Sequence, residues 1–273
     1  MKEFNIDKPI VKNIKYKIVK TKELQDGVII YLDNKEKIHL SVDSYFENAI
    51  NKQTGLDDKL YEKLKNEERL YLAYRGVLRK LSSKDYTIKQ IKDYLYIKKE
   101  LHKNEVDEII NRLCNYGLLD DDKYASNRAN YLNRQLLSVK QIKIKLSNEG
   151  ISKDLIDKYV INNSEDEYAK VNKLVSKYSN SIKNKSTLAI KQNILNKLVN
   201  AGYSYDICKE AIEKLNIKND CELDLLKKEY VKANKKYSKK YDDYELRSHI
   251  YAYLINKGFK SEDIKKVVGG YYG

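Results

Sequence analysis

The most regular hydrophobic pattern in the chain follows Gly117, where apolar residues recur with the period of an α-helix. Asp120 or Asp121 precedes this stretch and can cap a new helix by accepting backbone N–H groups of its first turn. The apolar positions fall at i, i+4, i+7 and i+11, and they are Ala125, Ala129, Leu132 and Leu136. The spacing predicts a helix that buries one face.

The start and end signals of this region recur along the chain. Thr87–Lys92 and Ser138–Lys143 are nearly identical hexamers, TIKQIK and SVKQIK, and each carries Gln three residues after its hydroxyl residue. That spacing predicts a capping box at the start of a helix. Gly150, Gly202 and Gly258 are each followed by an apolar residue, which predicts left-handed glycine caps at helix ends.

These signals predict four tandem three-helix repeats after an N-terminal module. Because short helical units cannot bury their apolar faces alone, we expect them to stack into an elongated, curved array. The first repeat has Glu100 and Leu101 where the others have glycine and an apolar residue, so its second helix is expected to close differently. The predicted bounds of the repeats are 65–118, 119–163, 164–217 and 218–273.

The first 64 residues differ from the remainder, because short segments alternate between apolar and polar positions. Three strands are predicted, within 10–19, 28–32 and 37–42, with turn signals at Asp26-Gly27 and Asp33-Asn34. A short helix capped by Asp43 or Ser44 follows. The predicted fold class is therefore mainly α, with a small N-terminal module that contains β-strands.

Composition supports this prediction and raises a question about partners. The chain has 273 residues with one Pro and 10 Gly, too few turn residues for a sandwich or barrel. Its net charge of +14 favours a polyanionic or acidic partner. Only seven of its 54 basic residues are Arg, so a compositional surplus of Lys remains an equally good explanation.

Cysteine usage and hydropathy indicate a protein of the cytoplasm. Cys114, Cys208 and Cys221 are irregularly spaced, which argues against a disulfide framework or a zinc site. No apolar run approaches the roughly 18 residues of a membrane-spanning helix. Residues 1–13 contain no apolar segment typical of a signal peptide.

The sequence offers no set of catalytic residues. Asp120–Asp122 is expected to cap a helix rather than bind a metal, because consecutive carboxylates point in different directions. His39, His102 and His249 have no local partner motif, and the familiar nucleotide, hydrolase and zinc motifs are absent. We therefore predict no catalytic residue, no metal and no cofactor.

A lysine-rich segment between residues 227 and 240 has two interpretations, a solvated helix or an electrostatic footprint. Tyr230, Val231, Ala233 and Tyr237 are its expected apolar positions. The third helix of each repeat is rich in Asp and Glu, so reading of a DNA groove by that helix is not expected. The basic patch consists of Lys227, Lys228, Lys232, Lys235, Lys236, Lys239 and Lys240.

The segments already described resemble the RecX family, whose members modulate the RecA recombinase in DNA recombination and repair. The resemblance is densest over 70–160, where GLLDDDKYA beginning at Gly117 is the most specific motif, and weaker beyond residue 165. It implies a non-enzymatic protein that lies in the groove of the RecA–DNA filament and restrains growth, ATP hydrolysis and strand exchange. By position it implies a contact surface formed by Tyr124, Arg128, Tyr131, Arg134, Lys140, Lys143 and Lys145.

Two hypotheses stay open at this point. The first is a monomeric regulator of the RecA filament, with contact to single- or double-stranded DNA through phosphates left open. The second is a free-standing helical protein that binds nucleic acid by electrostatics alone. Under the first hypothesis, reversing the charges of Arg128 and Lys143 should weaken filament binding and leave thermal stability nearly unchanged.

Overall fold

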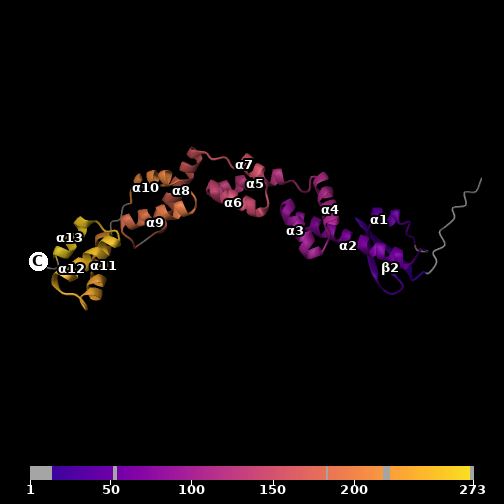
Figure 1. Ribbon diagram of the computed structural model, residues 1–273, viewed down its shortest axis with the longest axis horizontal. Coiled ribbons are helices and arrows are strands. Elements are labelled where there is room, and N and C mark those ends of the chain that lie inside the picture. Colours follow the sequence, from indigo (N-terminus) through magenta and orange to yellow (C-terminus); the bar gives the residue numbers. More distant parts are fainter. Residues whose placement is uncertain (1–13, 52–53, 183, 218–221, 271–273) are drawn as a thin grey trace, which may run out of the picture. The chain divides into compact units, whose positions relative to one another are not determined.

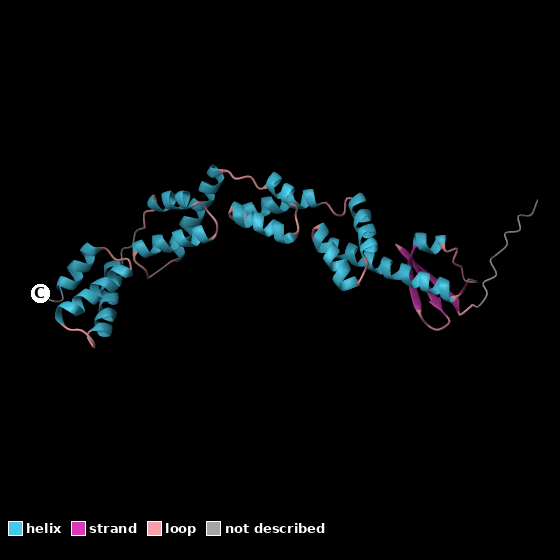
Figure 2. Ribbon diagram, in the orientation of Figure 1, coloured by secondary structure: helices cyan, strands magenta, loops and turns pink. Residues whose placement is uncertain are grey.

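The computed structural model describes residues 14–51, 54–182, 184–217 and 222–270. Within these residues the chain forms thirteen α-helices and one four-stranded antiparallel sheet, and the strands lie only near the N-terminus (Figure 2). The predicted fold class, mainly α after a strand-containing module, is confirmed. The chain divides into two compact units, Met1–Tyr124 and Ala125–Gly273, each described by itself.

The sheet of the first unit contains β1 (Tyr16–Leu24), β2 (Gly27–Leu32), β3 (Lys37–Ser41) and β4 (Gly55–Leu56), in the order β3-β2-β1-β4. Alternating residues of β2 and β3 face the core, where Ile30, Ile38 and Leu40 are fully buried. The sequence did not predict β4, since two residues carry no alternation. The start of the first predicted strand, at residues 10–13, lies outside the described residues.

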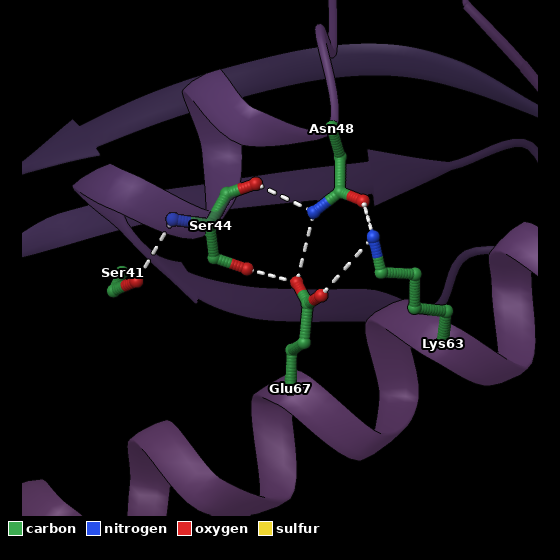
Figure 3. Close-up of polar contacts among 5 residues, drawn as sticks. All are labelled: Ser41, Ser44, Asn48, Lys63 and Glu67. Carbon is green, nitrogen blue, oxygen red and sulfur yellow. Dashed lines mark hydrogen bonds and ion pairs between the residues drawn. The ribbon is translucent and has the colours of Figure 1, made fainter.

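A network of polar contacts centred on Glu67 joins the sheet module to the first long helix, α2 (Asp58–Leu81). Ser44 lies in α1 (Val42–Glu47) and Asn48 directly follows it, and both donate hydrogen bonds to Oε2 of Glu67 (Figure 3). The Nζ atom of Lys63 lies 3.7 Å from Oε1 of the same carboxylate. The helix α1 is capped by Ser41, whose hydroxyl accepts from the Ser44 N–H. The predicted caps, Asp43 and Ser44, were wrong, because the N-cap lies two to three residues earlier, at Ser41.

The helix α2 packs with α3 (Ile88–Lys99) and α4 (Lys103–Asn115) around a core that includes Val77, Ile91 and Leu95. Glu100 ends α3 in the left-handed region, with φ of 52°. Its N–H bonds to the carbonyl of Leu95, five residues back, whereas the Gly150 N–H bonds four residues back. The end of α3 thus has the same left-handed turn as the end of α6 but differs in hydrogen-bond register, as the missing glycine predicted.

In the described part of the second unit every regular element is a helix, and the boundary between the units falls within α5. The last three helices, α11 to α13, pack against one another around a common core (Figure 1). The division into four repeats stays a prediction, and its boundary at 217/218 falls at the edge of the described residues. The helices are α5 (Asp121–Arg134), α6 (Val139–Glu149), α7 (Lys153–Tyr159), α8 (Ser164–Ser181), α9 (Thr187–Asn200), α10 (Tyr205–Glu213), α11 (Glu222–Tyr237), α12 (Asp243–Asn256) and α13 (Ser261–Gly270).

The predicted capping signals are confirmed. Thr87 and Ser138 both form complete capping boxes. Gly150, Gly202 and Gly258 adopt φ of 94°, 85° and 82°, which side chains with a Cβ rarely adopt. These helix ends are therefore fixed locally, before any packing between helices.

Two of the cap serines also join neighbouring helices. The Ser138 hydroxyl donates to the Ala201 carbonyl at 2.6 Å, and the Ser186 hydroxyl donates to the Lys257 carbonyl at 2.7 Å. A Cβ on Gly258 would lie 2.7 Å from the Ser186 oxygen, so the glycine also permits this close approach. Each serine thus satisfies the start of its own helix and the end of a helix more than 60 residues later.

Candidate protein-interaction surface

The predicted contact residues lie on α5 and α6, whose other faces form a small core. Ala125, Ala129 and Leu132 of α5 are buried, and so are Ile142 and Leu146 of α6. The predicted apolar stripe is confirmed for α5, and Leu136 is partly buried just beyond its end. Because these stripes face inward, the remaining positions of both helices are available to a partner.

Arg128 is held in a bidentate ion pair with Glu149, the last residue of α6. Its Nη2 lies 2.6 Å from Oε1, and its Nε lies 3.1 and 3.2 Å from the two carboxylate oxygens. The side chains are only 33% and 18% exposed. The guanidinium also lies over the Tyr131 ring, 5.5 Å from its centre. Arg128 therefore holds α5 against α6.

Lys143 of α6 forms a single, more exposed ion pair with an acidic residue of α7. Its Nζ lies 2.6 Å from Asp157 Oδ1, and this hydrogen bond holds the pKa of the Asp157 carboxyl below its usual value. Both acidic partners lie beyond the stretch from Lys123 to Asn148, which contains no Asp or Glu. Two of the seven predicted contact residues are thus already neutralised within the second unit.

The remaining predicted residues present positive charge and apolar area to solvent. Arg134, Lys140 and Lys145 are exposed and form no ion pair with any described residue. Tyr131 is 54% exposed, so it is not a core residue, and Tyr124 is half-buried. Exposed tyrosine and arginine side chains are enriched in protein interfaces.

Ile144 is an exposed apolar residue of α6 that the sequence analysis missed. It is 50% exposed and lies between Lys143 and Lys145 in the sequence. Its position two residues from both Ile142 and Leu146 places it off the buried stripe, which was the available signal. Ile144 therefore adds apolar area next to the exposed Lys145.

Some lysines of the basic patch at residues 227–240 form contacts with neighbouring side chains that the sequence did not indicate. Lys232 pairs with Glu229 at 2.6 Å, and this contact lowers the pKa of the Glu229 carboxyl. Lys236 lies over the Tyr237 and Tyr253 rings. Leu226, Tyr230 and Ala233 are buried, but Val231 is exposed, so its predicted place on the apolar side was wrong.

The predicted helix-capping role of the aspartates is confirmed for Asp120, which accepts from the Lys123 N–H at 3.0 Å. Asp121 instead accepts from the Ile88 N–H of α3, and burial raises the pKa of its carboxyl. A search of the described residues finds no group of three or more side chains suited to a metal ion. Cys114 and Cys208 are free thiols, and Cys221 lies outside the described residues.

The three histidines lie in separate surroundings. His39 pairs with Glu68 at 3.0 Å, His102 is the N-cap residue of α4, and the His249 ring lies against Tyr237 and Tyr241. None of the described helices is both long and apolar enough to cross a membrane.

Comparison with known proteins identifies the family. A model of the third three-helix domain of RecX matches residues 220–268. The regulatory protein RecX of Streptococcus pyogenes serotype M1 is 33% identical over 254 residues, which cover 91% of this chain and 96% of that protein. The chain belongs to the RecX family.

Other RecX proteins extend this result. The regulatory protein RecX of Streptococcus thermophilus strain CNRZ 1066 is 30% identical over 261 residues and is covered completely. A crystal structure of regulatory protein RecX superposes with a TM-score of 0.59 at 22% identity over 73% of this chain, which shows the shared fold. As a member of a family of regulatory proteins, this RecX chain has a regulatory role.

Proposed function

We propose that this RecX family member binds the RecA–DNA filament along its helical groove and restrains filament growth, ATP hydrolysis and strand exchange. The observation that carries the proposal is the match to proteins named regulatory protein RecX over nearly their whole length. We propose that it acts as a monomer, without a catalytic residue or cofactor. Tandem three-helix repeats would offer many weak contacts in series, which together give high affinity without a deep pocket.

Within this proposal, the contact residues separate into two groups. Tyr131, Arg134 and Lys145, with Tyr124 and Lys140, form the surface that meets the filament, and Ile144 adds apolar area. Arg128 and Lys143 instead hold the helices in place, because their charges are neutralised by Glu149 and Asp157. Charges that a partner must attract are better supplied by unpaired side chains, since these lose no existing ion pair on binding.

The test is inhibition of the DNA-dependent ATPase of RecA by the full chain at substoichiometric amounts. The variant Arg134→Glu/Lys145→Glu should need about tenfold more protein for half inhibition, or ~1.4 kcal/mol of binding energy. Lys173→Glu/Lys177→Glu, two exposed positions of α8, makes the same change in net charge and is the matched control.

Two results would reject the proposal in different ways. An unmodified chain that fails to inhibit at every ratio would reject a role at the RecA filament. Equal loss in both double variants would reject the surface on α5 and α6 and leave only general electrostatic attraction. Sedimentation at the assay concentration tests the monomer.

A further inference from the structure

A concave basic pocket lies between α2 and α3 in the first unit, and none of its lining residues belongs to the surface proposed above. Its volume is about 540 Å³, and four basic side chains line it with no carboxylate. This is unexpected in a chain with 40 acidic residues. The lining residues are Leu72, Arg75, Gly76, Arg79, Lys80, Ser83, Tyr86, Tyr94 and Lys99.

Three of the four basic side chains have no counterion. Arg79, Lys80 and Lys99 form no ion pair with any described residue, whereas Arg75 lies 2.9 Å from Asp26 at the edge of the pocket. The three unpaired residues lie in the last turns of α2 and α3. Helix dipoles favour cations there, so folding tolerates this concentration of positive charge.

Aromatic rings hold these charges in place. The Lys80 ammonium lies 4.6 Å from the Tyr94 ring centre and 5.2 Å from that of Tyr86. Lys99 lies 5.9 Å from the Tyr94 ring centre. Cation–π contacts of this kind fix a long side chain without neutralising it, so the charges stay available to an anion.

Gly76 forms part of the pocket wall. A Cβ at this position would lie 2.8 Å from the Tyr94 hydroxyl and 3.4 Å from the Lys99 side chain. Glycine in the middle of a helix is unfavourable relative to alanine, because it loses more conformational freedom on folding. Its presence in α2 keeps open a space that any other residue would partly fill.

We propose that this pocket binds the phosphodiester backbone of single-stranded nucleic acid directly, without RecA. The lining positions of α2 extend from Leu72 to Lys80, which is about 12 Å along a helix. Successive phosphates of one strand are about 3.4 Å apart along the axis of B-form DNA, so this length fits several phosphates in series. A chain of phosphates therefore fits the strip better than one small anion.

The test measures binding of a fluorescent oligothymidylate to the full chain by anisotropy, over a series of salt concentrations. Arg79→Gln/Lys99→Gln should lower affinity at least about tenfold at low salt and reduce the salt slope by about 1.4, or about 0.7 per lost phosphate contact. Lys89→Gln/Lys98→Gln, exposed positions of α3 outside the pocket, removes the same charge and should change affinity less than about threefold.

A third variant separates the pocket from net charge. Gly76→Leu fills the space beside Tyr94 at unchanged charge, and it should also lower affinity about tenfold. Thermal unfolding confirms that each variant is folded. Equal losses of affinity in the pocket pair and the control pair would overturn the proposal. Unchanged affinity in both pocket variants would also overturn it and would point instead to an acidic protein partner. Because RecA is absent, this result is independent of the ATPase test.

Discussion

The Arg128–Glu149 pair allows a quantitative test of how α5 and α6 are held together. Exposed ion pairs contribute little to stability, about 0–1 kcal/mol. This pair differs because Arg128 makes three N–H···O contacts to one carboxylate, and both side chains are at least two-thirds buried. Bidentate, charge-assisted hydrogen bonds of this kind are stronger than neutral ones.

The expected magnitudes follow from that geometry. Arg128→Gln removes the guanidinium hydrogen bonds to the Glu149 carboxylate and should cost about 1.5–3 kcal/mol of unfolding free energy, the range for hydrogen bonds to charged groups. Arg134→Gln, six residues later in the same helix and without an ion pair among the described residues, should cost less than about 0.5 kcal/mol. Both variants remove one positive charge from the same helix. The difference between their free energies of unfolding therefore reports the ion pair and not the loss of charge.

A double-mutant cycle measures the pair itself. The free energy of unfolding in urea is determined for the unmodified chain, Arg128→Gln, Glu149→Gln and the double variant. We expect a coupling energy of about 1–2 kcal/mol, since each single change removes the direct contact between the two side chains. A coupling below about 0.5 kcal/mol, within the usual error of additivity, would show that Arg128 is not structural and would return it to the candidate contact surface.

Three further predictions concern stability. Glu68 is buried, which alone would raise the pKa of its carboxyl, but hydrogen bonds from Lys65 and His39 hold that pKa below its usual value of 4.5. Glu68→Gln should therefore destabilise the fold at neutral pH, and its difference from the unmodified chain should shrink as pH falls below about 4.5, whereas exposed Glu62→Gln should show no such trend in urea titrations. Ser186→Ala loses a helix cap and leaves the Lys257 carbonyl without its donor, so it should lower the free energy of unfolding by about 1.5–3 kcal/mol in thermal unfolding. Ser152→Ala, at a cap with no second partner in the described part of the chain, should cost about 1 kcal/mol, and equal costs would contradict a role of Ser186 in joining two helices. Glu100→Gly should stabilise the fold by about 0.5–1 kcal/mol because φ is 52° at this position, whereas Lys98→Gly inside the same helix should destabilise it by about 1 kcal/mol. A loss of stability in both variants would show that the left-handed conformation of Glu100 is not strained.

The helices could be predicted because their signals are local. A capping box needs only a hydroxyl residue and Gln three residues later, and a left-handed cap needs only a glycine, so Ser138 and Gly150 can be identified within one short segment. The strand β4 could not be predicted, because its two residues are defined by pairing with Tyr16 and Lys17 of β1, about 40 residues earlier. Pairing of that kind depends on the tertiary fold.

The candidate surface was only partly predictable for the same reason. The sequence identified a stretch without acidic residues and assigned its charges to a partner. Glu149 and Asp157 lie outside that stretch but reach Arg128 and Lys143 across helix packing. The sequence predicted that reversing those two charges would leave thermal stability nearly unchanged. We now expect a loss of stability instead, because a glutamate at position 128 would face Glu149.

The cap serines show how a repeated sequence can position its own helices relative to one another. A helix N-cap normally needs only an acceptor, and the hydroxyl proton is then free. At Ser138 and Ser186 that proton is donated to a carbonyl at the end of a later helix. In each case the accepting residue directly precedes a glycine in the left-handed region. An aspartate would cap either helix equally well but has no proton to donate at neutral pH, and its charge would face a carbonyl oxygen. The choice of serine at these positions is thus explained by contact between helices that lie far apart in the sequence.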